Sequence, residues 1–358
     1  MSNIAQRRLN NQHLVAPTLT DAVAVVRALA AVQAQDYGGG KWAIAQRIKR
    51  LGKDADIEQA VASGAVLRTH VLRPTWHFVL PEDVRWMLEL TARRVAGAMA
   101  SYNRKLGLDA KMFRKSHAAL ERALQDGQHL TRTELAAALR RAGVQASTGQ
   151  HVGNLLLQAE LDRVIISGAR RGKQFTYALF DTRVPAAAPR DRDEALHDLA
   201  RRYFATRGPA TVQDFAWWSG LTVADAARGV AAAAGFLARE THEGRRDYWH
   251  APTARAAARA ARVAHLLPNY DEYFVGFKDR SAFSERLRRT LSHHPVDALM
   301  GHVVVVGGQI VGGWRRTVSK TVAVELDLLV PLTVPERTLV RRAAERFGEF
   351  LGLRSKTR

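Results

Sequence analysis

Residues 66–80 read VLRTHVLRPTWHFVL, and their pattern predicts a β-hairpin. Residues 66–71 and 75–80 are rich in β-branched and aromatic side chains, which favour strands, and the proline-containing stretch between them favours a tight turn. Helical periodicity precedes the hairpin in three segments between residues 18 and 63. Helices followed by a two-stranded wing are the order of a winged helix, which is a common DNA-binding module.

The same order of helices and hairpin occurs twice more along the chain. A long helix predicted over residues 81–106, with Pro81 in its first turn, follows the first unit. The second unit has predicted helices over residues 109–125, 131–141 and 149–161 and strands over 164–167 and 175–179. After a linker at 184–189, the third has predicted helices over residues 191–206, 211–219 and 222–234 and strands over 237–241 and 247–250.

The C-terminal part of the chain changes to a strand-forming composition. Strands are predicted over residues 264–267, 303–306, 309–314 and 321–329, and an amphipathic helix follows over 335–351. The fold class is therefore α+β and mainly α, with three tandem winged-helix units followed by a β-barrel-like domain. We expect the first winged helix and its long helix over 1–106, the others over 107–183 and 190–252, and the barrel-like domain with its terminal helix over 260–358.

The net charge of the chain predicts a polyanionic partner. Its 358 residues include 54 Lys and Arg against 34 Asp and Glu, a formal charge of +20. Such an excess of positive charge favours binding to nucleic acid through counterion release. An Ala- and Arg-rich composition is, however, also typical of proteins from GC-rich genomes. The lack of cysteine excludes disulfides, thiolate metal ligands and cysteine nucleophiles. Neither a signal peptide nor a membrane span is expected, which predicts a cytoplasmic, nucleoid-associated protein.

Two glutamines in residues 31–47, AVQAQDYGGGKWAIAQR, are the candidate chemical groups. On a continuing helix the side chains of Gln33 and Gln35 would diverge by about 200°. They can converge on one point only if the helix ends or unwinds there, and the glycines at 38–40 indicate such an end. Gln33 is then expected in the last helical turn and Gln35 on the exit turn. Taken alone, two glutamines near a helix end are an ordinary feature.

The Gln-Ala-Gln stretch, with the Lys-Trp-Ala that follows it, resembles the Gln-apolar-Gln motif of the AlkZ/YcaQ-type winged-helix DNA glycosylase family. Three further blocks agree in the same order. HVLRPTWHFV at 70–79 resembles the first wing of that family, LLPNYDEYFVGFKDR at 266–280 the start of its β-barrel, and GGWRRT at 312–317 a later strand. The resemblance implies monofunctional excision of cationic N-alkylpurines, and in some members of crosslinks or antibiotic adducts.

The resemblance also implies that Gln33 and Gln35 occupy the two polar positions of the catalytic motif. One branch of the family has an acid at the second position, and Gln35 matches the antibiotic-resistance branch instead. An amide oxygen is too weak a base to remove a proton, but it can accept a hydrogen bond from water and orient it. A cationic alkylpurine is already a good leaving group, so position and dipoles carry the reaction. Asp36 is a minor alternative as a base, with helix capping as its expected role.

Basic residues near the motif and at the wing tips are the candidate DNA contacts. Lys41, Arg73 and His77 belong to the first predicted winged helix. The alternatives are that Lys41 is merely solvated and that His77 has a structural role. The other candidates are Arg170, Arg171 and Lys173 in the second wing, Arg245 and Arg246 in the third, and Lys278, Arg280, Arg315 and Arg316 in the C-terminal domain. Since Arg315 and Arg316 are adjacent on a predicted strand, at most one of them should face DNA.

Other interpretations of the sequence are weaker. Asp271 and Glu272 form a carboxylate pair that suggests a glycosidase or metal site, but adjacent residues on a strand point apart, which favours a structural network. His293 and His294 lack metal-ligand spacing, so neither a metal nor a cofactor is expected. The expected partner is double-stranded DNA carrying alkylated bases, bound by a monomer. The alternative function is a non-enzymatic winged-helix regulator, and an RNA-directed role is disfavoured because no aromatic single-strand platform is evident.

Overall fold

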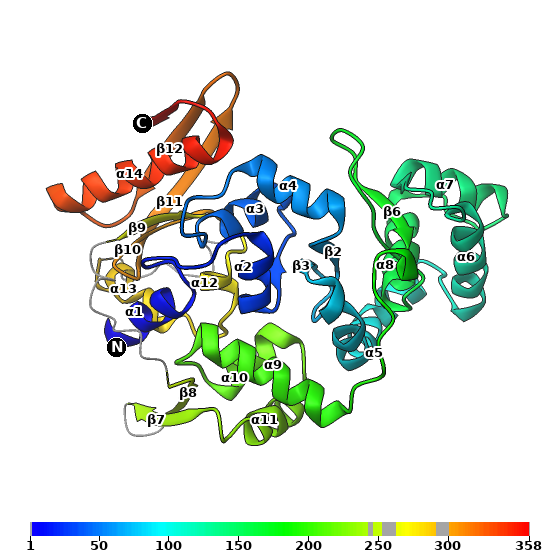
Figure 1. Cartoon of the computed structure of the whole chain (residues 1–358), viewed down its shortest axis with the longest axis horizontal. Coiled ribbons are helices and arrows are strands. Elements are labelled where there is room, and N and C mark those ends of the chain that lie inside the picture. The colour runs from blue at the N-terminus through cyan, green and yellow to red at the C-terminus, as the bar shows by residue number, and fades with distance from the viewer. Residues whose placement is uncertain (1, 243–245, 253–262, 291–300, 358) are drawn as a thin grey trace. The chain divides into compact units, whose positions relative to one another are not determined.

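The computed structural model describes residues 2–242, 246–252, 263–290 and 301–357. The fold is mixed α+β: helices predominate as far as α11 (Val223–Ala232), and a curled five-stranded sheet follows near the C-terminus (Figure 1). The chain forms two compact units. The first comprises Met1–Glu58, Leu196–Trp218 and Thr222–Arg358, and the second comprises Gln59–Ala195 and Ser219–Leu221. This division follows contacts in space, and the division into winged helices along the sequence stays a prediction.

Short helices make up the N-terminal and central parts of the first unit. They are α1 (Ser2–Asn11), α2 (Ala22–Leu29), α3 (Tyr37–Ala45), the start of α4 (Asp54–Ser63), most of α9 (Arg192–Arg207), and α10 (Val212–Ser219) and α11. Asp21 caps α2 by accepting a hydrogen bond from the Ala24 N–H at 2.8 Å, as its cap-forming sequence predicts. Helix α1 was not expected from its polar sequence, yet it buries Ile4 and Leu9.

The C-terminal sheet of the first unit is open. Its strands lie in the order β13 (Ser355–Thr357), β12 (Val322–Leu328), β11 (Gln309–Val318), β10 (Val303–Val306) and β9 (Ala264–Leu267). All neighbours pair antiparallel except β12 and β13. Gly307 and Gly308 form the predicted tight turn, and both have a positive φ. The expected barrel-like domain is therefore confirmed as a half-barrel, with β11 longer than predicted.

Helix α14 (Val334–Leu351) packs on this sheet and anchors helix α3. Its predicted apolar face, which includes Phe347 and Phe350, is buried. The Trp42 ring of α3 lies 5.2 Å from each of these phenylalanine rings, and its indole N–H donates to the Leu266 carbonyl of β9 at 2.6 Å. The helix that follows Gln33 and Gln35 is therefore held by an aromatic cluster and a buried hydrogen bond.

The second unit contains two hairpins and a helical layer. The first hairpin pairs β2 (Leu67–His70) with β3 (Trp76–Val79), and the second pairs β5 (Ile165–Ser167) with β6 (Thr176–Leu179), which also pairs with β4 (Leu130–Thr131). The helices are the end of α4, α5 (Pro81–Lys105), α6 (Ala110–Ala123), α7 (Arg132–Arg141), α8 (Gly149–Leu161) and the start of α9. All of these helices and both hairpins were expected. An apolar cluster that includes Leu120, Leu139 and Leu155 fills the space between α6, α7 and α8.

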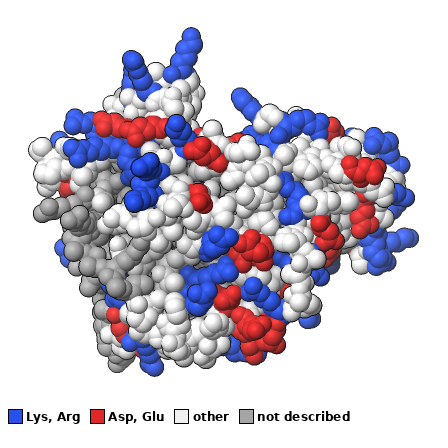
Figure 2. All heavy atoms as spheres, in the orientation of Figure 1, with Lys and Arg blue, Asp and Glu red and all other residues white. Residues whose placement is uncertain are grey.

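Charged residues are scattered over the visible surface without forming one basic stripe. Figure 2 shows Lys and Arg interspersed with Asp and Glu on a surface of mainly other residues. None of the helices in the described part of the chain combines the length and apolar character that crossing a bilayer needs.

Candidate active site

The two glutamines lie in a short non-helical segment between α2 and α3. Helix α2 ends at Leu29, Ala30 has a positive φ of 65°, and β1 (Val32–Gln33) is extended. The expectation that Gln33 lies in the last helical turn is therefore wrong. The condition stated for convergence, that the helix ends before the motif, is nevertheless met, and Gln35 lies in a bend that follows β1.

The glycines at 38–40 begin the next helix and do not end the previous one. Asp36 caps α3, and its carboxylate accepts a hydrogen bond from the Gly39 N–H at 3.1 Å. A Cβ on Gly39 would stand 2.6 Å from that carboxylate, so only glycine leaves room for the cap. The capping role expected of Asp36 is confirmed, and it commits one carboxylate oxygen to the backbone.

The glutamines differ in burial. Gln33 is only 5% exposed, and its backbone N–H donates to the Glu272 carboxylate at 2.8 Å. Gln35 is exposed at the protein surface. The segment therefore begins in the protein interior and reaches the solvent within two residues.

Asp271 and Glu272 belong to the expected structural network. Asp271 pairs with Arg47 at 2.8 Å, and Glu272 pairs with Arg207 at 2.6 Å; all four side chains are fully buried. They lie at the start of the short helix α12 (Glu272–Val275), not on a strand as the sequence suggested. Arg207 was missed by the sequence analysis, because nothing near it in the sequence marks it as a partner of Glu272.

Arg316 lies close to the motif through Asp36. Its guanidinium is 3.3 Å from the Asp36 carboxylate and 3.0 Å from Nε2 of His302. Burial, assisted by the nearby Arg316 charge, lowers the pKa of His302 to about 4, so this imidazole is neutral at physiological pH. As expected for neighbours on one strand, Arg315 is exposed whereas Arg316 is partly buried.

The other basic candidates of the first unit differ in exposure. Lys41 is buried and pairs with Asp54 and Glu58 at 2.9 and 2.8 Å, so its charge is balanced inside the fold. Arg280 is partly buried over the Phe274 ring. Lys278, Arg246 and Arg315 are exposed. Arg245 and the His293–His294 pair lie outside the described residues.

In the second unit, the basic candidates of the second hairpin are more accessible than those of the first. His77 is buried, with its ring Nδ1 2.9 Å from the Thr75 carbonyl oxygen, which favours the structural alternative. Arg73 is partly buried. Lys173 and Arg171 are exposed in the loop of the second hairpin, and Arg170 lies over the Phe175 ring at 5.1 Å.

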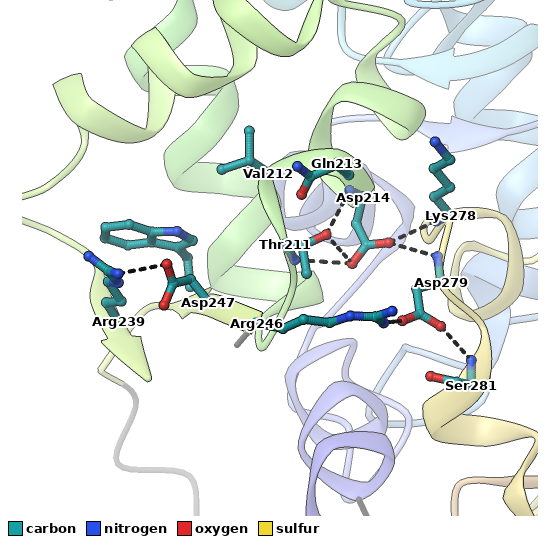
Figure 3. A pocket seen from close by; sticks show the side chains of 11 residues that line it. Thr211, Val212, Gln213, Asp214, Arg239, Arg246, Asp247, Lys278, Asp279 and Ser281 are labelled. Carbon is teal, nitrogen blue, oxygen red and sulfur yellow. Dashed lines mark hydrogen bonds and ion pairs between the residues drawn. The ribbon is translucent and has the colours of Figure 1, made fainter. Parts of the chain in front are cut away.

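A large cavity in the first unit is not lined by the two glutamines. It has a volume of about 820 Å³ and lies between α10, the β7 (Ala238–His242) and β8 (Arg246–His250) hairpin, and residues 278–281. Figure 3 shows that its arginines are paired, Arg239 with Asp247 and Arg246 with Asp279. Lys278 donates its backbone N–H, not its ammonium group, to Asp214 at 2.9 Å (Figure 3). The described lining has as many carboxylates as cations, so it does not single out an anionic ligand.

A metal centre is not indicated where the side chains are described. Within those residues, no three or more His, Asp or Glu side chains come together in a way that could hold a metal ion. The chemistry of the segment from Gln33 to Asp36 must therefore be judged from its amides, its one carboxylate and their neighbours.

The chain is similar to known proteins over nearly its whole length. The family model described as DNA glycosylase AlkZ-like matches residues 26–350. The solved structure of Streptomyces sahachiroi DNA glycosylase AlkZ is similar, with a TM-score of 0.79, 23% sequence identity, and coverage of 100% of this chain and 99% of that chain. At this identity the likeness shows the fold. No match is found among the curated proteins.

The family match decides between the two functions that the sequence left open. A non-enzymatic regulator is not supported, since the matched family is one of DNA glycosylases and the match covers most of the chain. The expected enzyme class, a hydrolase that acts on N-glycosyl bonds and serves DNA repair, is confirmed. The chain belongs to the AlkZ-like DNA glycosylase family.

Proposed function

We propose that this glycosylase hydrolyses the N-glycosidic bond of cationic alkylated purines in double-stranded DNA, with the attacking water positioned by Gln33 and Gln35. The substrates are N7- or N3-alkylpurines, with crosslinks and antibiotic adducts as larger members of the same class. The observation that carries the proposal is the position of the two amides, on a short non-helical segment that leaves the interior at Gln33 and reaches solvent at Gln35.

The chemistry follows from the charge of the lesion. Alkylation at N7 or N3 makes the purine cationic, so the C1′–N bond breaks without prior protonation of the base. The sugar then develops oxocarbenium character, and water adds at C1′. An amide oxygen can hold that water and face the developing positive charge without being protonated itself. Uncharged purines remain poor leaving groups, so two neutral amides select for activated lesions.

We further propose that DNA is bound by exposed cations of the three helix–hairpin units and the C-terminal sheet. Lys173, Lys278 and Arg315 are exposed, and no hydrogen bond or ion pair from another described residue engages their charged ends. Arg171 and Arg246 are exposed but pair with carboxylates. The three units are proposed to be winged helices over residues 1–106, 107–183 and 190–252, in a monomeric enzyme.

The test is base release from defined duplexes under single-turnover conditions. We expect the protein to release N7-methylguanine and leave abasic sites, and to leave uracil and unmodified guanine in place. Gln33→Ala and Gln35→Ala should each lower the excision rate by about 100-fold or more while DNA affinity changes little. Gln128→Ala, which removes an exposed glutamine of the second unit, is the matched control and should excise normally. Normal excision by the Gln33/Gln35 double variant would refute the assignment.

A further inference from the structure

The backbone of the segment leading into the motif is held by one buried ion pair. The Arg207 guanidinium donates to the carbonyl oxygens of Leu29 at 3.1 Å and Ala31 at 3.2 Å. The Glu272 carboxylate accepts the Gln33 N–H at 2.8 Å. Three backbone groups, at alternate residues of the chain between α2 and the motif, are thus bound by two side chains.

The two side chains are themselves fixed. Arg207 and Glu272 pair at 2.6 Å with no exposed surface on either side chain. The second Glu272 oxygen also accepts the indole N–H of Trp218 at 2.9 Å, and the Arg207 guanidinium lies 4.3 Å from the centroid of that ring. Glu272 therefore has one oxygen on Gln33 and the other on Arg207 and Trp218.

Stability alone is a poor reason for such a pair. Moving two charges out of water is unfavourable, and apolar residues of similar volume often replace a buried ion pair with no loss of stability. What apolar residues cannot provide is a set of directed bonds to backbone groups. Here those bonds hold the turn at Ala30 and the extended chain at Gln33, which no helix or helix cap fixes.

We propose that Glu272, oriented by Arg207 and Trp218, is a positioning residue that sets where the Gln33 amide stands during excision. This inference rests on the proposed role of Gln33. Glu272 is fully buried, so it is closed to a duplex at the surface and acts through its hydrogen bond to the Gln33 N–H and through its ion pair with Arg207. A displacement of about 1 Å at a group that positions a reactant can lower a rate by about 100-fold.

The neighbouring pair of Arg47 and Asp271 offers a matched control. It is equally buried, its contact is 2.8 Å against 2.6 Å for Arg207 and Glu272, and Asp271 directly precedes Glu272 in the sequence. The remaining hydrogen bonds of Arg47 go to Gln12 and to the Ala43 carbonyl, not to residues 29–33. A change of Asp271 should therefore disturb the core to a similar extent without displacing the Gln33 backbone.

The experiment compares Glu272→Gln, Asp271→Asn, Gln33→Ala and the Glu272→Gln/Gln33→Ala double variant in the full-length protein. Urea denaturation gives the fraction folded, anisotropy gives the Kd for a duplex containing N7-methylguanine, and single-turnover assays with saturating enzyme give the excision rate. We expect Glu272→Gln to lower that rate about 10- to 100-fold with the Kd within about twofold. Asp271→Asn should stay within about threefold, and Gln33→Ala should have a smaller effect in the Glu272→Gln background than alone.

Equal rates for folded Glu272→Gln and Asp271→Asn, or fully additive effects of Glu272→Gln and Gln33→Ala, would overturn the positioning role. An unaffected Gln33→Ala variant would instead overturn the proposed function. If Glu272→Gln does not fold, Trp218→Phe decides: it keeps a ring but removes the donor to Glu272, and we expect the excision rate to fall about 3- to 10-fold. An unchanged rate in Trp218→Phe would then refute the proposal.

Discussion

An arginine–glutamate ion pair lies in the interior of the first unit, and another lies at the surface of the second unit, beside its second hairpin. Arg207 and Glu272 meet at 2.6 Å in a site closed to water. Arg171 and Glu134 meet at 2.9 and 3.0 Å, but their side chains are 55% and 42% exposed. Solvent access makes the difference: the buried pair can only hold its neighbours in place, whereas the exposed arginine can exchange its carboxylate for a phosphate.

The exposed pair stays charged over the physiological range. The Arg171 hydrogen bond, with those from Thr131, lowers the pKa of Glu134 to about 2. Glu134 also completes the capping box that begins α7, so it serves the helix as well as the hairpin. The second hairpin therefore presents Lys173 and an exposed, paired Arg171, whereas Arg207 is closed to solvent.

The largest expected effect comes from breaking the buried pair. Arg207→Met leaves the Glu272 charge buried without its guanidinium, and the free energy of unfolding should fall by about 3–5 kcal/mol. Urea denaturation measures it. Arg171→Met, at the exposed pair, should leave the unfolding midpoint almost unchanged. If both variants lose the same stability, burial is not what separates the two regions.

Replacing both buried partners sharpens the comparison. In Arg207→Met/Glu272→Met no unpaired charge is left at this site, so part of the lost stability should return. The excision rate should not return with it, because the backbone groups of Leu29, Ala31 and Gln33 have lost their partners. A double variant that excises at the wild-type rate would show that the directed bonds are dispensable.

The pH dependence of stability should also separate buried from exposed groups. Burial lowers the pKa of His265, on β9, to about 3, against about 6.5 in an unfolded chain. The folded state thus favours the neutral imidazole, and this stability is full above pH 6.5 and is lost as the pH falls toward 3. His265→Phe should remove about 2 kcal/mol of the stability loss between pH 6.5 and 5, measured by urea denaturation. The exposed Glu134 should affect the stability of the fold in a lower pH range, between about pH 4.5 and 2. An identical pH profile in His265→Phe would contradict this prediction.

The smallest effects are expected at the wing. Lys173→Ala should weaken DNA binding and lower the slope of log K against log salt by about 1 if Lys173 contacts a phosphate. Excision by saturating enzyme should stay unchanged, which separates a binding residue from Gln33. Anisotropy between 50 and 200 mM KCl is the measurement, and an unchanged slope would remove Lys173 from the interface.

Freeing Arg171 tests the exchange of carboxylate for phosphate. Glu134→Gln keeps a side chain that can complete a capping box but removes the charge that pairs with Arg171. DNA affinity should rise by at most about fivefold, which is the scale of an exposed ion pair. Weaker binding in this variant would mean that Glu134 orients Arg171 for DNA and does not compete with it.

Much of the local structure could be predicted because it depends on neighbouring residues. The cap at Asp21, the capping box at Thr131 and the turn at Gly307–Gly308 are examples, because each forms between residues a few positions apart. The end of α2 could not be placed, because residues 30–33 are apolar enough to continue a helix. Helix α2 ends at Leu29, where the carbonyl oxygen accepts a hydrogen bond from Arg207. That residue lies 178 positions further along the chain.

The candidate site was predicted by motif and only in part by geometry. The sequence singled out Gln33 and Gln35 and favoured a structural network at Asp271 and Glu272. It did not reveal that Lys41 and His77 are buried, because burial depends on which segments pack over them. The relation between Gln33 and Glu272 spans 239 residues and leaves no periodic signal in the sequence.

The sequence by itself determined the local elements of this protein, since capping, turn formation and apolar periodicity act between residues a few positions apart. It also determined the family, through blocks that keep their order along the chain. Only the tertiary structure decided which arginines are accessible to a ligand and which are buried in ion pairs. The reason is physical: the effect of a charge depends on its access to water and on partners that folding brings from distant parts of the chain.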